Sequence, residues 1–293
     1  MHQHRIRIGL IGNDLSTSLS PQIHEREAVH QGLDGYRYEL LDLEDQPEVA
    51  KDLGAFIAAK LAAGYTGFNV THPYKQVVMQ HLDALSPAVE ALGAVNTIVL
   101  REDGTLLGEN TDYTGFLTAL QRNMSDCPRE RVVLIGAGGA GSAVARALAD
   151  FGVGRLDIVD PDQDRREQLR EKIAQTQTEA AAWEPTALPD LLAAADGVVN
   201  ATPIGMENIP GTPLDLNLLE QRHWVGDVIY RPIETELLKH AASLGCRRLD
   251  GTQMLIEQAG DGFRLLTGVE PDVQRMRAEL QQSLQHSRSG EGS

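Results

Sequence analysis

The sequence of 293 residues lacks the features that define several large classes of protein. No apolar run approaches the roughly 18 residues that a membrane-spanning helix needs. The N-terminus runs into a predicted strand without a signal-peptide layout, which favours a cytoplasmic protein. The only two cysteines, Cys127 and Cys246, have no metal-ligand spacing, and the histidines form no zinc motif. We therefore expect neither a disulfide framework nor a bound metal.

Positive charge is also scarce. The chain has 26 lysines and arginines against 42 acidic residues, a net charge of -16. This balance argues against nucleic acid and against acidic membrane surfaces as partners. It does not argue against small anionic ligands, because backbone amides and one or two local cations can hold those.

The most informative stretch that is present reads RVVLIGAGGAG, from Arg131 to Gly141. Val132–Ile135 is an aliphatic run of the length of a buried parallel strand. Gly136, Gly138 and Gly141 follow at G-x-G-x-x-G spacing and lead into a predicted helix. Such glycines allow a tight turn, close approach of amides to a pyrophosphate, and close packing of helix on strand.

The context of this loop separates it from an ordinary glycine turn. A second strand, Leu156–Val159, ends in Asp160, which lies 19 residues after Gly141. A dinucleotide-binding fold places at this point the acid that hydrogen-bonds the adenosine ribose. We expect a dinucleotide site, with a purely structural turn as the alternative.

Strands and helices alternate through both halves, which predicts an α/β fold of two domains with a parallel, doubly wound sheet in each half. We expect a first domain of residues 1–112, completed by two helices within 252–286, which the family resemblance described below implies to be the substrate-binding, catalytic domain. The second is a Rossmann-type domain of residues 113–251. Residues 287–293 are expected to form a disordered tail.

Polar residues gather in loops and at strand ends of the first domain. Ser18 and Ser20 are two apart in an extended segment, so both hydroxyls can reach one anion; alternatively Ser20 is only the N-cap of the next helix. Lys75 is expected in or beside the first turn of a helix that starts at Pro73, where a cation is unfavourable. Lys75 is suited to proton transfer if Asp112 lies nearby. The alternative is that Lys75 is an ordinary surface lysine and Asp112 the N-cap of a helix.

Six separated motifs together resemble the shikimate dehydrogenase family. They cover nearly the whole chain, from about residue 8 to 285. The motifs are Ser18-Leu-Ser20-Pro21, Asn69-Val-Thr71-His-Pro73-Tyr-Lys75, Gly93-Ala-Val-Asn96-Thr97, Asn110-Thr111-Asp112, Asn200-Ala-Thr202-Pro203-Ile-Gly205-Met206 and Asp250-Gly251 through Met254 and Gln258.

The resemblance implies a catalytic pair, a substrate pocket and a nucleotide site. The implied catalytic pair is Lys75 and Asp112. The implied substrate contacts are Ser18, Ser20, Thr71, Asn96, Tyr230 and Gln258. The cofactor contacts expected from the glycine loop and the resemblance are Gly136, Gly138, Gly139, Ala140, Gly141, Asp160, Arg165, Thr202, Met206, Val228 and Gly251.

One departure from the family's biosynthetic members concerns the cofactor. Those enzymes use NADP and carry an Asn-Arg-Thr type segment where this chain reads Val159-Asp160-Pro161-Asp162. An acid accepts the ribose hydroxyls of NAD and repels a 2′-phosphate. In this the chain looks most like the NAD-dependent quinate/shikimate dehydrogenases of the family, with NADP as the weaker cofactor and Arg165 as a residue that could moderate the preference.

Two alternatives remain open at this stage. One is an NADP-dependent biosynthetic shikimate dehydrogenase, which Asp160 disfavours. The other is a catalytically silent protein that senses dinucleotides, which the presence of Lys75 and Asp112 disfavours. The sequence leaves monomer and homodimer both open.

Overall fold

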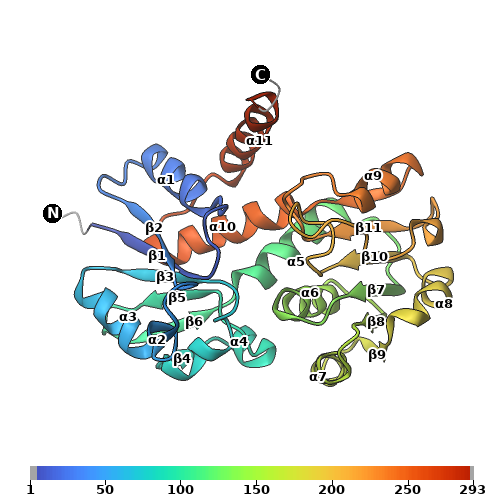
Figure 1. The fold of residues 1–293 in the computed structure, drawn as a ribbon, viewed down its shortest axis with the longest axis horizontal. Helices are drawn as coiled ribbons and strands as arrows, with labels where there is room; N and C mark the ends of the chain where they lie inside the picture. Colours follow the sequence, from blue (N-terminus) through green and yellow to red (C-terminus); the bar gives the residue numbers. More distant parts are fainter. Residues whose placement is uncertain (1–4, 291–293) are drawn as a thin grey trace. The chain divides into compact units, whose positions relative to one another are not determined.

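The computed structural model describes residues 5–290, and side chains through residue 283. The chain divides into two compact units (Figure 1). The first comprises Met1–Thr111 and Gln258–Ser293, and the second comprises Asp112–Glu257. The second unit is thus an insertion in the first. Two helices cross the divisions, α5 (Thr111–Asn123) and α10 (Gly251–Thr267).

The first unit contains a six-stranded sheet in the order β2-β1-β3-β5-β6-β4. Its strands are β1 (Arg7–Gly12), β2 (Arg37–Asp42), β3 (Gly67–Val70), β4 (Ala84–Leu85), β5 (Thr97–Leu100) and β6 (Leu106–Glu109). The expectation of a parallel sheet in this half is wrong for β5, which runs antiparallel to both β3 and β6. The cause is the hairpin turn at Gly104, whose φ of 84° reverses the chain.

Two apolar clusters cover the two faces of this sheet. Ile11 and Ile98 face the cluster that includes Ile57 of α3, whereas Ile8 faces the cluster that includes Phe263 of α10. The helices of this unit, besides α5 and α10, are α1 (Ser20–His30), α2 (Pro47–Ala50), α3 (Leu53–Ala62), the 3-10 helix η1 (Val77–His81), α4 (Pro87–Leu92) and α11 (Val273–Gly290).

Two helical segments of this unit are interrupted. The chain forms two helices between residues 47 and 62, α2 and α3, because the Asp52 side chain accepts the backbone N–H of Ala55 and starts a new helix there. The helix predicted to start at Pro73 is a series of turns followed by η1. Lys75 therefore lies in a turn, and the argument from an unfavourable helix dipole does not apply to it.

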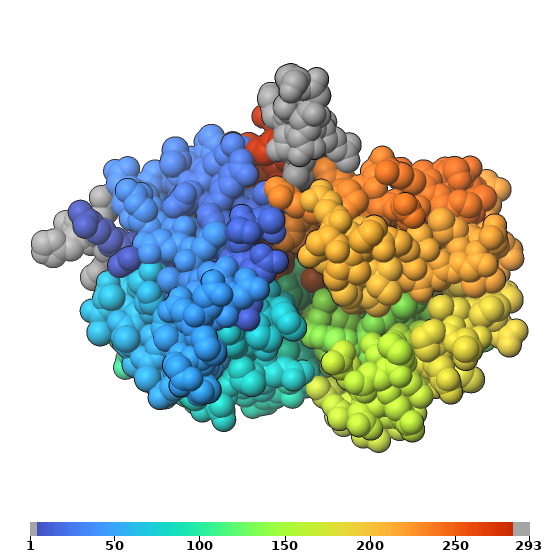
Figure 2. All heavy atoms as spheres, in the orientation of Figure 1, coloured from blue at the N-terminus to red at the C-terminus, as the bar shows by residue number. Residues whose placement is uncertain are grey.

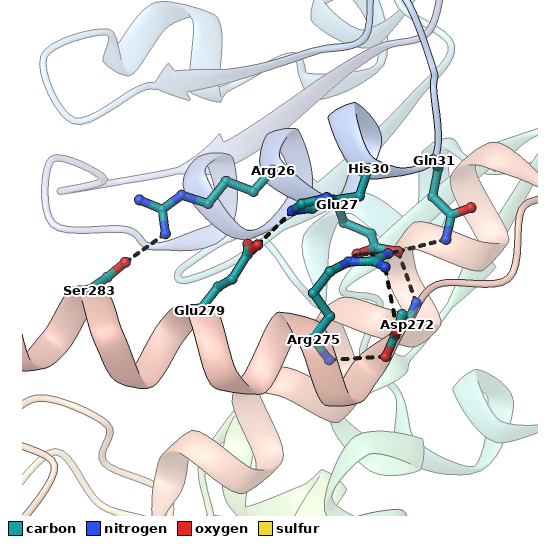
Figure 3. A network of polar contacts seen from close by, with 8 residues as sticks. All are labelled: Arg26, Glu27, His30, Gln31, Asp272, Arg275, Glu279 and Ser283. Carbon is teal, nitrogen blue, oxygen red and sulfur yellow. Dashed lines mark hydrogen bonds and ion pairs between the residues drawn. The ribbon is translucent and has the colours of Figure 1, made fainter.

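Helix α11 is joined to α1 by polar contacts around Glu27, whose side chain is almost fully buried (Figure 3). Arg275 places Nη2 2.7 Å from Glu27 Oε1, and the backbone N–H of Asp272 donates to the same oxygen at 2.9 Å. Farther along, His30 Nε2 lies 2.6 Å from Glu279 Oε1. The structure continues α11 through residues 287–290, which the sequence pattern assigned to a disordered tail; residues 291–293 lie outside the described range.

The second unit contains a six-stranded sheet that is parallel throughout, in the order β12-β11-β10-β7-β8-β9. Its strands are β7 (Arg131–Ile135), β8 (Arg155–Val159), β9 (Glu179–Trp183), β10 (Gly197–Asn200), β11 (Trp224–Asp227) and β12 (Arg247–Leu249). Its helices, besides α5 and α10, are α6 (Gly139–Asp150), α7 (Gln163–Ile173), the 3-10 helices η2 (Pro185–Ala187) and η3 (Leu216–Leu218), α8 (Leu188–Ala193) and α9 (Glu236–Ser243).

Strand β7 shows why this sheet is doubly wound. Val132 and Leu134 face an apolar cluster with Leu148 of α6, whereas Val133 faces a cluster with Leu238 of α9. Successive residues of a strand point to opposite faces, so helices must cover both. The predicted Rossmann-type topology of this half is confirmed. No helix in the described part of the chain is long and apolar enough to cross a membrane.

Candidate functional site

The glycine loop of the second unit needs its glycines for two different reasons. Gly136 has a φ of 105°, and a Cβ on Gly141 would lie 2.1 Å from the carbonyl oxygen of Gly136. Both positions exclude any side chain. At Gly138 and Gly139 a Cβ would meet nothing within 4 Å. The loop is therefore tightly packed beneath and open at the start of α6, where free N–H groups can meet a phosphate.

Asp160, directly after β8, has a buried carboxylate that supports this loop. Its Oδ2 accepts the backbone N–H of Ala137 at 2.8 Å, and its Oδ1 accepts that of Asp162 at 2.9 Å. A carboxylate has about four lone-pair positions, so two remain for ligand hydroxyls. Asp160 can thus shape the loop and bind a ribose at once.

A second carboxylate follows at the start of α7. Asp162 is the N-cap of this helix and accepts the backbone N–H of Arg165 at 3.1 Å. The guanidinium of Arg165 lies 3.3 Å from Asp162 Oδ2 and is 63% exposed. Arg166 donates to the carbonyl oxygens of Asp160 and Pro161. Helix α7 lies at the surface of the second unit (Figure 2). At its start the acidic Asp162 precedes the cationic Arg165 and Arg166 in the chain.

The loops after β10 and β11 are joined by a polar network in which Asp227 and Thr235 lie outside every sequence motif. Asn200 Nδ2 donates to Asp227 Oδ1 at 3.1 Å, and Asn200 Oδ1 accepts from the Thr202 hydroxyl at 2.7 Å. Thr235 donates to Asp227 Oδ2 at 2.8 Å. Burial raises the pKa of Asp227 to about 6, although its hydrogen bonds oppose this shift. The signal in the sequence for this network was Asp227, a single acidic residue at the end of a buried strand.

The remaining predicted cofactor residues of the second unit lie on these two loops or beside them. Val228 donates its N–H to the Asn200 carbonyl at 3.0 Å, and Met206 pairs with Ile209 in a short bridge. Gly251 is explained by packing: a Cβ there would lie 2.4 Å from the carbonyl oxygens of Val228 and Ile229. The predicted glycine is thus required to bring α10 against the strand-end loop.

In the first unit, the two serines lie at the start of α1. The Ser20 N–H lies 3.4 Å from Ser18 Oγ, and both serines are partly exposed. The expectation that Ser20 caps α1 is wrong, because Leu19 occupies the cap position and Ser20 is the first helical residue. The Ser20 hydroxyl is therefore not used as a cap. Pro21 follows in the first turn, where a missing N–H costs nothing.

Thr71 and Lys75 occupy the turn between β3 and η1. Thr71 donates its N–H to the Ile11 carbonyl and accepts the N–H of Tyr74. The Lys75 carbonyl accepts the N–H of Val95 at 2.8 Å, so its backbone is fixed to the segment that leads to Asn96. The half-buried lysine is therefore carried by a turn held at both ends.

Asn96 is the centre of the buried polar contacts in this unit. Its Oδ1 accepts the backbone N–H of Thr111 at 2.7 Å, and its Nδ2 lies 3.4 Å from Gln258 Oε1. Asn110 donates to the Ala94 carbonyl at 2.8 Å. Two motifs that are about 160 residues apart, at Asn96 and Gln258, thus come together in this unit.

The predicted site residues divide between the units. Ser18, Ser20, Thr71, Lys75, Asn96 and Gln258 belong to the first, whereas Asp112, Tyr230 and all predicted cofactor residues belong to the second. Asp112 is buried and directly follows Thr111, and burial raises the pKa of Tyr230. Both cysteines are buried and free, and no cluster of potential metal ligands occurs among the described residues.

Comparison with known proteins is consistent with this architecture. The family model for the shikimate dehydrogenase substrate binding domain matches residues 10–98, and that for the shikimate 5'-dehydrogenase C-terminal domain matches residues 251–281. A ThiF family model matches residues 116–181, around the glycine loop.

Relatives match over almost the full length. The shikimate dehydrogenase (NADP(+)) of Streptomyces avermitilis is 48% identical, with 96% of each chain covered. The quinate/shikimate dehydrogenase (NAD(+)) of Corynebacterium efficiens is 46% identical, covering 95% of this chain and 98% of the relative. The structure of quinate dehydrogenase from Corynebacterium glutamicum in complex with NAD has a TM-score of 0.89 and 45% identity, covering 94% and 99% of the two chains. This chain belongs to the shikimate dehydrogenase family.

Proposed function

We propose that this enzyme oxidises quinate and shikimate to their 3-dehydro acids with NAD. Asp160 and Asp162 support the choice of cofactor: the residues after the second strand of a dinucleotide-binding fold meet the adenosine ribose, so these carboxylates would oppose a 2′-phosphate. Arg165 is paired with Asp162. Relatives named as NAD(+) enzymes support the same choice. The two free lone pairs of buried Asp160 suit the ribose hydroxyls of NAD.

The second unit has the features that a dinucleotide requires. Gly138 and Gly139 leave open space at the N-terminus of α6, where the pyrophosphate would meet backbone N–H groups. Ala140 and Gly141 continue that first turn. Thr202, Met206, Val228 and Gly251 would line the cofactor from the loops after β10, β11 and β12. When bound, NAD accepts the hydride.

The first unit supplies the groups that bind the acid. Ser18 and Ser20 would hold the carboxylate, and Thr71, Asn96 and Gln258 would hydrogen-bond ring hydroxyls, joined by Tyr230 of the second unit. Hydroxyls and amides both donate and accept, so they suit a ligand that carries several hydroxyls. Quinate has one hydroxyl more than shikimate, beside the carboxylate, and the small serines would tolerate it.

Lys75 and Asp112 would handle the proton. As the alcohol is oxidised, its hydrogen leaves carbon as hydride and its hydroxyl proton passes to Lys75 Nζ. The carboxylate of Asp112 would orient the lysine and stabilise its protonated form. The turn that holds the Lys75 backbone supports this role, because a general base must be fixed in position.

A panel of two substrates and two cofactors tests the proposal. With either acid we expect kcat/KM for NAD to exceed that for NADP at least about tenfold, because the 2′-phosphate would face Asp160 and Asp162. The rates are followed at 340 nm. Equal efficiency with both cofactors would mean that Arg165 and Arg166 control selection, and exclusive use of NADP would favour the biosynthetic alternative.

We also propose that the enzyme works in the cytoplasm, as a monomer or a homodimer. Light scattering of the purified protein would determine the oligomeric state. Release of the protein by periplasmic extraction of the source cells would contradict the location.

A further inference from the structure

A series of hydrogen bonds joins Tyr38, in β2, to the predicted substrate contacts. The Tyr38 hydroxyl lies 2.9 Å from Asn69 Oδ1, and Asn69 Nδ2 lies 2.9 Å from Thr97 Oγ1. Thr97 Oγ1 lies 3.0 Å from Asn96 Oδ1, and Asn96 Nδ2 meets Gln258. All five residues belong to the first unit, and Tyr38 lies outside every motif of the family resemblance.

Two backbone groups fix the direction of each hydrogen bond. The Asn96 carbonyl can only accept, so the Asn69 atom 3.3 Å from it is the donor Nδ2. The Thr111 N–H can only donate, so the Asn96 atom that meets it is Oδ1. Both Oδ1 atoms are acceptors. The hydroxyl protons of Tyr38 and Thr97 must therefore point at Asn69 and Asn96 respectively.

In this arrangement the Tyr38 hydroxyl is a donor to Asn69 Oδ1. Tyr38 is 5% exposed and Thr97 is fully buried, so water reaches neither readily. Asn69 is half-buried, and without the hydroxyl its Oδ1 would lose this protein donor. Its amide would then be held through Nδ2 alone, by the Asn96 carbonyl and Thr97, and would be less firmly oriented. The change would pass along the series to Asn96.

We propose that Tyr38 is a positioning residue of the substrate site, which holds the amide of Asn96 in one orientation through Asn69 and Thr97. The proposal rests on the proposed function, because Asn96 and Gln258 are the expected contacts of the acid. The pKa of Tyr38 is raised by burial, while a hydrogen bond with the Ser20 side chain opposes the shift. Tyr38 thus lies between the serines and the amides of the site.

Tyr36 provides a matched control. It lies just before β2 and is 4% exposed, almost the same as Tyr38. Its hydroxyl lies 3.1 Å from His24 Nδ1, outside the series that leads to Asn96. Tyr36→Phe and Tyr38→Phe therefore remove the same atom from equally buried places, and only Tyr38→Phe affects the proposed series.

Steady-state kinetics of the full chain with NAD and either acid test the role. We expect Tyr38→Phe to lower kcat/KM for the acid about tenfold, mainly through its KM, and to leave the KM for NAD within about twofold. Tyr36→Phe should stay within about twofold on all parameters, even where both variants lower the unfolding temperature equally. Equal losses in the two variants, or no loss in Tyr38→Phe, would overturn the proposal.

Variants of Thr97 test whether the effect of Tyr38 reaches Asn96 through the Thr97 hydroxyl. Thr97→Ser keeps the hydroxyl and should retain most activity, whereas Thr97→Val should resemble Tyr38→Phe. Combining Tyr38→Phe with Thr97→Val should lose little more than the worse single change, because both interrupt one series. Fully additive losses would contradict it. The wild-type rate alone tests the proposed function, and the ratios of variants to wild type test Tyr38, so the two failures are distinguishable.

Discussion

The two units prepare their binding sites by different physical means. In the first, amides and hydroxyls such as those of Asn69, Thr97 and Asn96 are held by directed hydrogen bonds. In the second, the decisive residues around the glycine loop have no side chain, and the backbone itself is shaped by Gly136 and Gly141. The first unit should therefore be sensitive to the loss of a single polar atom, and the second to the gain of a single methyl group.

The largest loss of turnover should come from a substitution in the first unit, and NAD binding should be unchanged. We expect Lys75→Ala to lower turnover by roughly two to four orders of magnitude, the usual scale for a positioned acid-base group, with much smaller changes in substrate affinity. Single-turnover and steady-state rates at 340 nm would measure this.

Lys51 offers a control, because its side chain is 69% exposed and pairs only with Glu48 in the described contacts. Lys51→Ala should behave as wild type. Asp112→Asn should also slow turnover, and less than additively with Lys75→Ala. Near-normal turnover in Lys75→Ala would remove this lysine from the proton transfer.

The pH dependence of stability should have opposite signs in the two units. Burial lowers the pKa of His24 to about 3, so the unfolded first unit takes up this proton more readily and the folded unit loses stability as the pH falls from 6.5 toward 3. Burial raises the pKa of Asp227 to about 6, so the second unit gains from this group below about pH 3.8 and loses that gain as the pH rises to 6. The full effects are on the order of 5 and 3 kcal/mol respectively.

The tryptophans make this comparison measurable. The chain has two, Trp183 and Trp224, and both lie in the second unit. Urea unfolding followed by their fluorescence reports that unit, and circular dichroism reports both. Asp227→Asn should remove the loss between pH 4 and 6 from the fluorescence signal. If it leaves that slope unchanged, another group controls the stability of this unit.

Two glycines of α6 should give the smallest and most local effects. Gly141→Ala would place a methyl group 2.1 Å from a backbone carbonyl oxygen, so we expect a loss of about 1 to 3 kcal/mol of unfolding free energy in the second unit. Gly139→Ala meets no neighbour, and alanine favours a helix by about 1 kcal/mol over glycine, so stability should hold or rise while NAD binding weakens. Equal destabilisation by both changes would contradict the packing argument.

Much of this architecture could be predicted from local patterns. The buried strand, the glycines and Asp160 together predicted the parallel sheet of the second unit, because each constraint acts within a few residues. The turn at Gly104 between β5 and β6 is local and is readable from Glu102-Asp103-Gly104, whereas the antiparallel pairing of β5 with β3 joins strands that are distant in sequence, and the pattern of a parallel sheet missed it. The turn at Lys75 was also predicted incorrectly, as the start of a helix. The sequence marks Asp227 as an acid at the end of a buried strand, but its partners Asn200 and Thr235, like the partner Asn69 of Tyr38, become known only when the structure shows which polar atoms meet.

The contact between Glu27 and Arg275 also sets an order of assembly during synthesis. Glu27 is made early, but its partner Arg275 is added only after the whole inserted unit has been translated. The second unit is continuous in sequence and can fold as soon as it emerges. The first unit is completed only when α11 is available, and until then the Glu27 carboxylate is exposed to water. The part of the enzyme that is translated first is therefore the part that is completed last.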